Sequence, residues 1–174
     1  MPTPLTHSVV GYLVVKSVEI GKDTKRFIVW SVFFSTLPDI DFITSIVCKN
    51  PFSPLHHRGA FHSLGAVFVL FIILKSLKLQ DKLLYTLLYS LHIIMDFMSK
   101  DLYFPYGIML LWPFSNQYYQ GFPLFMGVPY KSDSLKPGSF IFPVIYNVII
   151  VIVIYLLANL LLKGFFYYEK QKKG

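Results

Sequence analysis

An imidazole and a carboxylate stand four residues apart in the second half of an apolar stretch, residues 83–98, which reads LLYTLLYSLHIIMDFM. Residues at positions i and i+4 share one face of a helix, so His92 and Asp96 should point the same way inside a segment that suits lipid. Two such groups are costly there and need a partner. A metal ion is one partner, because both groups are ligands and the charge of the ion offsets the cost of burial. A hydrogen bond between helices is the alternative for this pair alone.

Further histidines and aspartates lie near the ends of other apolar segments. With the first pair they form a set of candidate metal ligands: His7, Asp39, Asp41, His57, His62, His92 and Asp96. One tetrahedral ion uses fewer donors, so the set favours two divalent ions, about 3.5–4 Å apart, that share a bridging carboxylate and a water. Mixed imidazole and carboxylate ligation suits zinc, manganese or iron, with zinc expected first.

Such a centre is suited to the hydrolysis of a phosphoester. Asp41 or Asp96 would handle the proton of the attacking water. Arg58 offers a planar fork of donors to a phosphate oxygen, although contact with a lipid headgroup is an equal alternative. His56 is left out of the set, because a residue adjacent to His57 cannot easily face the same ion.

Composition places the whole set in a membrane protein. The chain has 174 residues, of which 55% are hydrophobic and only 14% charged, which is too apolar for an ordinary soluble domain. Its basic residues fall in short clusters between apolar runs instead of a stripe with interleaved aromatics, which argues against a nucleic-acid partner. The single cysteine, Cys48, excludes an internal disulfide and a thiolate metal site.

The apolar runs predict an all-α, polytopic membrane bundle that forms one domain over residues 1–174. Four spanning helices are expected at residues 27–47, 62–77, 82–98 and 140–162, after a short N-terminal helix at residues 5–18. Pro38 should kink or end the second segment near Leu37. The connection at residues 99–139 is long and rich in proline, glycine and aromatics, so we expect it to cover the site, an aromatic belt without catalytic duty being the alternative.

Lysine and arginine placement predicts the orientation. Alternate loops and the basic tail at residues 163–174 hold eleven of these residues, and the remaining loops hold five. The positive-inside rule then predicts that the protein lies in the cell membrane with its C-terminus in the cytoplasm and its N-terminus outside. In this orientation all seven candidate ligands arrive in the outer half of the membrane. Unrelated polar contacts would have no reason to converge in this way, so the convergence favours a metal centre.

The order of several motifs resembles that of the YdjM-like family, which is described as LexA-binding, inner membrane-associated, metal-dependent hydrolases. The matching motifs, which reach to about Ser115, are Thr6-His7 before Gly11, Leu37-Pro-Asp-Ile-Asp41, His57-Arg-Gly-Ala-Phe-His-Ser63, His92-x-x-x-Asp96 and Gly107-Ile-Met-Leu-Leu-Trp-Pro-Phe114. The resemblance implies that His7, Asp39, His57, His62, His92 and Asp96 are ligands and that Asp41 is a ligand or the base that orients water. The His-x-x-x-Asp helix is more distantly similar to one that holds zinc in zinc-dependent phospholipase C and the S1/P1-type nucleases. Ser99 stands where many relatives carry threonine, and the connection to Gly107 is longer than usual, so the resemblance assigns no role to that loop.

These observations predict a membrane enzyme, a metal-dependent hydrolase that cleaves a phosphoester or phosphodiester of a phospholipid or another amphiphile. An ester or amide bond of a lipid is the next choice. A transporter of metal ions or small solutes is the first alternative, but it should show polar residues through both halves of the membrane and often an internal repeat, and neither is visible. A regulatory membrane protein that uses an ion as a structural clamp is the second, and it would tolerate closed coordination.

Overall fold

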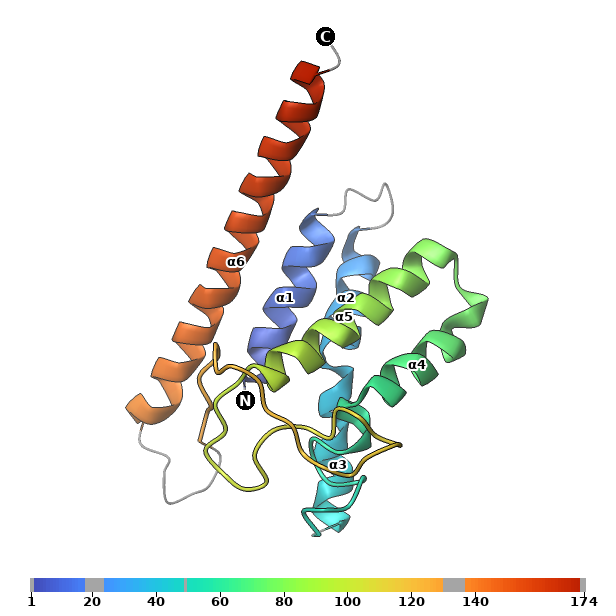
Figure 1. The fold of residues 1–174 in the computed structure, drawn as a ribbon, viewed down its shortest axis with the longest axis vertical. Coiled ribbons are helices and arrows are strands. Elements are labelled where there is room, and N and C mark those ends of the chain that lie inside the picture. Colours follow the sequence, from blue (N-terminus) through green and yellow to red (C-terminus); the bar gives the residue numbers. More distant parts are fainter. Residues whose placement is uncertain (1, 18–23, 49, 130–136, 173–174) are drawn as a thin grey trace.

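The computed structural model describes residues 2–17, 24–48, 50–129 and 137–172, and the side chains of residues 24, 137 and 161–172 lie outside this description. Within these ranges the chain is helical and has no β-strand, which confirms the predicted all-α class. Figure 1 shows α1 and α2 side by side, a hairpin of α4 and α5 next to them, and the long α6 on the opposite side. The elements in order are α1 (Pro4–Ser17), α2 (Thr24–Thr36), η1 (Leu37–Ile40), α3 (Asp41–Val47), η2 (Ala60–His62), α4 (Leu64–Ile73), η3 (Leu74–Ser76), α5 (Leu79–Phe97) and α6 (Pro137–Lys172), where η denotes a 3-10 helix.

Helices α1 and α2 approach closely because small residues face each other. A Cβ atom on Gly11 would lie 2.6 Å from the Ser35 hydroxyl oxygen and 2.8 Å from the Ser31 carbonyl oxygen. Small residues at a helix crossing let two backbones pack closely where apolar burial alone gives little driving force. Gly11 therefore sets the separation of the two helices that carry His7 and Ser35.

Pro38 interrupts the second apolar segment, as predicted. Helix α2 ends at Thr36, and the chain continues as the 3-10 helix η1 and then as α3. Proline lacks an N–H group and disfavours helical geometry in the residue before it, so the regular helix cannot pass through this position. At the start of η1 the missing N–H costs nothing. The interruption brings Asp39 and Asp41 to the end of the bundle, where Asp41 is fully buried.

The hairpin of α4 and α5 begins with a defined cap. The hydroxyl oxygen of Ser63 accepts a hydrogen bond from the Ala66 amide at 3.0 Å, which satisfies one of the free N–H groups at the start of α4. Helix α5 then places Leu84, Leu88 and Ile93 in the core against α2. His92 and Asp96 lie in the last turns of this buried helix.

The expected bundle of four spans is met only in part. Two segments, Lys25–Val47 and Gly138–Leu160, are long and apolar enough to cross a membrane. Helix α4 has 10 residues before it tightens into η3, which gives a length of about 15 Å against a hydrocarbon core of about 30 Å. Helix α6 contains the predicted last span and continues to Lys172, so most of the expected tail is helical. Five of the lysines that predict the orientation lie outside the described residues: Lys22, Lys49, Lys131, Lys136 and Lys173.

The connection after α5 has no helix from residue 99 to residue 129, as predicted, and lies across the end of the bundle that holds the N-terminus and α3 (Figure 1). It is fastened at several points: the Leu64 amide donates to the Leu110 carbonyl at 2.9 Å, and the Met109 amide donates to the Arg58 carbonyl at 2.9 Å. Gly107 has a φ of +92° and faces the Tyr119 carbonyl so closely that no side chain fits there.

A polar tie joins this connection to α6. The Asn147 side chain is fully buried, accepts a hydrogen bond from the Met126 amide at 2.8 Å and donates one to the Met126 carbonyl at 2.9 Å. The carbonyl oxygen and the NH2 group of the Asn147 side chain are thus both hydrogen-bonded inside an apolar helix, as burial in lipid or protein requires.

Gly11→Ala should destabilise the protein by about 1–3 kcal/mol, because the added methyl group must push α1 away from α2. Thermal unfolding of the detergent-solubilised chain measures this change. Gly138→Ala is the matched control, because a Cβ atom at Gly138 meets no atom within 4 Å. Equal unfolding temperatures for the two variants would contradict the close crossing.

Candidate metal centre

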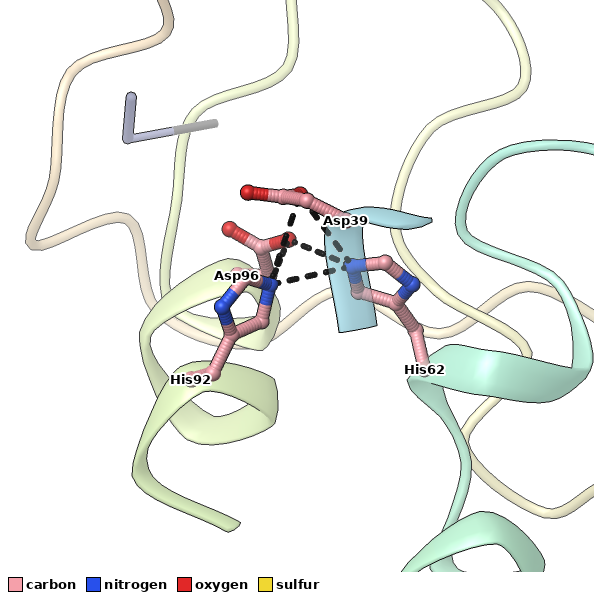
Figure 2. Close-up of side chains that lie close together, drawn as sticks. All are labelled: Asp39, His62, His92 and Asp96. Atoms are coloured by element: carbon pink, nitrogen blue, oxygen red, sulfur yellow. Dashed lines mark hydrogen bonds and ion pairs between the residues drawn. The ribbon is translucent and has the colours of Figure 1, made fainter. Parts of the chain in front are cut away.

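Four buried side chains from three elements meet at one end of the bundle. Figure 2 shows Asp39 from η1, His62 from η2, and His92 and Asp96 from α5, all pointing toward one another. One donor atom from each of these residues lies within 4.8 Å of the others, a spacing that could hold a metal ion. The i, i+4 pair on α5 shares one face as predicted, with His92 Nε2 3.5 Å from Asp96 Oδ2.

The outer nitrogen of each imidazole is fixed by an oxygen acceptor. His62 Nδ1 lies 2.9 Å from Asp41 Oδ2, and His92 Nδ1 lies 2.8 Å from the carbonyl oxygen of Ser35. Neither a carboxylate nor a carbonyl has a proton to give, so both Nδ1 atoms carry the proton. Each Nε2 lone pair then points into the cluster, which is the arrangement that second-shell oxygens give to metal-binding histidines.

The two Nε2 atoms and the carboxylates need a positive charge between them. His62 Nε2 is 3.2 Å from His92 Nε2 and 3.1 Å from Asp96 Oδ2, while Asp39 Oδ1 is 3.5 Å from His92 Nε2 and 3.9 Å from His62 Nε2. The Asp39 and Asp96 carboxylates face these imidazole nitrogens as ion pairs but make no hydrogen bond of ordinary geometry in the structure. Buried polar atoms are otherwise almost always hydrogen-bonded, and these four side chains could hold a divalent cation.

The separations agree with this interpretation. Metal–ligand bonds of about 2.0–2.2 Å in a tetrahedral site place neighbouring donors about 3.3–3.6 Å apart. The six donor pairs measured around the cluster, including His7, run from 3.1 to 3.9 Å.

His7, which belongs to α1, lies beside the group of four residues. Its ring stacks on that of His92 with centroids 3.7 Å apart, and its Nε2 lies 3.4 Å from Asp96 Oδ1. Both nitrogens of His7 are buried without a hydrogen-bond partner. His7 is therefore the fifth candidate donor of this group.

Asp41 and His57 form a second group with His62. Asp41 Oδ1 contacts His57 Nδ1, and Asp41 Oδ2 accepts a hydrogen bond from the Arg58 amide at 2.9 Å as well as facing His62. The spacing of this group could also hold an ion. The residue shared by the two groups is an imidazole, whereas the sequence led us to expect a shared carboxylate. Ions in both groups at once would need His62 to ligate through both nitrogens and lose both protons.

Burial lowers the pKa of the His57 imidazole, and the Asp41 carboxylate opposes this shift without cancelling it. His57 also stacks on Phe42 with ring centroids 3.9 Å apart. Burial has the opposite effect on Tyr118, because it disfavours the phenolate and raises the pKa to about 12. The Tyr118 hydroxyl donates a hydrogen bond to the Pro51 carbonyl at 2.8 Å. His56 is half-buried, with Nδ1 3.1 Å from the His57 carbonyl oxygen, and takes part in neither group.

Arg58 is engaged with a residue that the sequence did not single out. Its Nη1 lies 2.6 Å from Asp101 Oδ2 and the side chain is buried, while its Nε has no hydrogen-bond partner in the structure. The backbone of Arg58 has a φ of +69°, a left-handed conformation that costs a non-glycine residue about 1–2 kcal/mol. Asp101 is the only acidic residue between positions 97 and 132, which is a signal that could have identified it.

A family model described as YdjM inner membrane protein matches residues 1–168, a range that includes every candidate ligand. Neither a curated protein nor a solved structure matches the chain. The distant similarity to zinc-dependent phospholipase C therefore gains no support from these comparisons.

Purified protein should contain one divalent ion per chain, measured by elemental mass spectrometry after purification without chelator. The pair His92→Ala and Asp96→Ala should remove the ion because it deletes two of the four donors, while His56→Gln, the matched control, should retain it. His57→Gln should also retain it. A second ion in the parent that His57→Gln removes would instead place an ion in the group of Asp41, His57 and His62, and a parent without metal would return these histidines to hydrogen bonding between helices.

Asp101→Asn should destabilise the protein by about 3–5 kcal/mol, because it leaves the buried Arg58 charge without its partner. The double variant Asp101→Asn with Arg58→Met should recover part of this loss. Thermal unfolding of the two single variants and the double variant measures the coupling, and Lys100→Gln, an exposed neighbour, is the control. If the losses in stability of the two single variants simply add in the double variant, the contact between Arg58 and Asp101 contributes no stability.

Proposed function

The chain belongs to the YdjM inner membrane protein family, and we propose that it is a metal-dependent hydrolase that cleaves a phosphoester or phosphodiester of a phospholipid or another amphiphile. The observation that supports this most is the cluster of buried carboxylate and imidazole atoms without hydrogen-bond partners. A protein built only for lipid packing would gain nothing from these atoms, since each one is costly to bury.

Asp39, His62, His92 and Asp96, with His7 beside them, are the residues that would hold the ion. When bound, a divalent ion supplies Lewis-acid chemistry, since it makes water a nucleophile at neutral pH and offsets negative charge on a phosphoryl group. The donor set suits zinc, manganese or iron.

The residues around this group hold its ligands in place. Asp41 and the Ser35 carbonyl keep His62 and His92 in the tautomer whose Nε2 faces the cluster. Both oxygens of Asp41 are already engaged as acceptors, so we assign it the role of a positioning residue instead of the base expected from the sequence.

Asp39 is the better candidate for the proton acceptor. Its side chain is 8% exposed, whereas those of His62, His92 and Asp96 are fully buried. A carboxylate at the edge of the cluster, with two oxygens that have no hydrogen-bond partner, can accept the proton of an attacking water and pass it to solvent. Arg58 Nε has no hydrogen-bond partner and can donate to a phosphate oxygen, while Nη1 of the same side chain is engaged with Asp101.

The setting supports an amphiphilic substrate. Asp39 and Asp41 belong to the segment Lys25–Val47, which is long and apolar enough to cross a membrane. Large aromatic side chains near the same end are exposed, including Phe52, Phe104, Phe114 and Phe122. These exposed phenylalanine rings offer an apolar surface to acyl chains, so a lipid phosphoester could approach this end of the bundle from the membrane.

A structural ion is the second candidate, because the deep burial of three of the four donors favours closed coordination. Substrate turnover separates the hydrolase from the structural ion. If the ion is structural, the metal content and the thermal stability would depend on the cluster, but no lipid would be consumed.

Metal-loaded protein in mixed micelles should release a phosphorylated headgroup or inorganic phosphate from phospholipid, detected by mass spectrometry of both products. Asp39→Asn should lower kcat by about 100-fold or more, because it removes the proposed proton acceptor, which is also one of the four candidate ligands. His56→Gln is the control and should keep full activity. Metal-loaded, folded protein that leaves phospholipids of every tested headgroup intact would reject the proposal in favour of the structural ion.

A further inference from the structure

A groove lies between α2, η3 and the start of α5, and none of the candidate metal ligands lines it. Its volume is about 680 Å³, which falls within the range of about 300–1,000 Å³ for small-molecule sites. Aromatic rings form much of its wall: Phe27, Trp30, Phe34 and Tyr85. Asp81 lines it too and lies fifteen residues before Asp96 on α5, about 22 Å along the helix. The groove therefore extends toward the end of the bundle opposite the metal centre.

The rim of the groove is basic. Arg26 and Lys78 line it and are exposed, and Asp81 lines it with the opposite charge. Lys25 and Lys75 flank the rim and are also exposed. Asp81 is the one carboxylate at this end among the described side chains, and within these the cations outnumber the anions around the opening. An anionic group is the ligand that this rim complements.

The groove also has the depth of a lipid chain in one leaflet. The apolar segment of α2 begins at Lys25, which places Arg26 at the level of the headgroups. Phe34 lies eight residues further along, about 12 Å deeper. Trp30, between them, is 43% exposed, as is usual for tryptophan near the membrane interface.

We propose that this groove binds an anionic phospholipid of the leaflet opposite the metal centre. One acyl chain lies against Phe27, Trp30 and Phe34, and the phosphate contacts Arg26 and Lys78. Basic pockets between membrane helices bind anionic headgroups in this way. The site is separate from the hydrolytic centre and does not depend on the proposed function.

The protein contains a reporter for this site. It has two tryptophans. Trp30 lines the groove, and Trp112 lies in the connection at the other end. Trp112→Phe leaves Trp30 as the single tryptophan, which can be excited selectively over the tyrosines. Titration in mixed micelles with phosphatidylglycerol or phosphatidylcholine, each with the same brominated acyl chains, then reports which lipid contacts Trp30. We expect phosphatidylglycerol to quench at lower mole fraction.

Adding Arg26→Gln and Lys78→Gln should weaken this preference by about fivefold for each cation removed. The matched control removes the same charge from the exposed Lys16 and Lys100, which neither line nor flank the groove, and should leave the preference nearly unchanged. The converse variant, Trp30→Phe with Trp112 intact, should show no preference. Equal quenching by the two lipids at Trp30, or a preference that Arg26→Gln and Lys78→Gln leave intact, would overturn the proposal.

Discussion

The cost of burying carboxylates and imidazoles in an apolar bundle is the constraint on which the rest of this structure depends. Asp39, Asp96 and His7 have buried polar atoms without hydrogen-bond partners, and His62 and His92 turn their Nε2 atoms toward one another. Neutral imidazoles cannot relieve this arrangement, because their two Nε2 lone pairs and the two negatively charged carboxylates repel one another. The surrounding fold holds these groups in place through Ser35, Asp41 and the close crossing at Gly11.

The second layer of the site links distant parts of the chain. The Ser35 carbonyl that orients His92 belongs to the turn of α2 that packs on Gly11 of α1. Asp41 joins η2 and the loop before it to the start of α3. Arg58 continues this layer to Asp101 and so fixes the connection after α5 over the same end of the bundle. Helix packing and ligand orientation are therefore achieved by the same contacts.

Much of this arrangement could be predicted from local sequence, and the remainder could not for identifiable reasons. Pro38 predicts the interruption of the second segment, because its effect on the backbone is local. The i, i+4 spacing predicts the shared face of His92 and Asp96. The contact between Arg58 and Asp101 depends on the path of an irregular connection, for which no periodic pattern exists. The Ser35 acceptor is a backbone carbonyl, which residue type does not reveal. The change of α4 into a 3-10 helix at Leu74 is not marked by a proline or glycine, so it could not be predicted from the sequence.

The position of Asn147 has a consequence for biogenesis. All candidate ligands precede Ser99, and α6 begins only at Pro137. A chain inserted from its N-terminus can therefore assemble the whole centre before α6 leaves the ribosome. The backbone amide and carbonyl of Met126 gain their hydrogen bonds only when the Asn147 side chain is in place. Packing of α6 thus completes the hydrogen bonding of Met126 in the connection after α5, and it follows the synthesis of every segment that carries a candidate ligand.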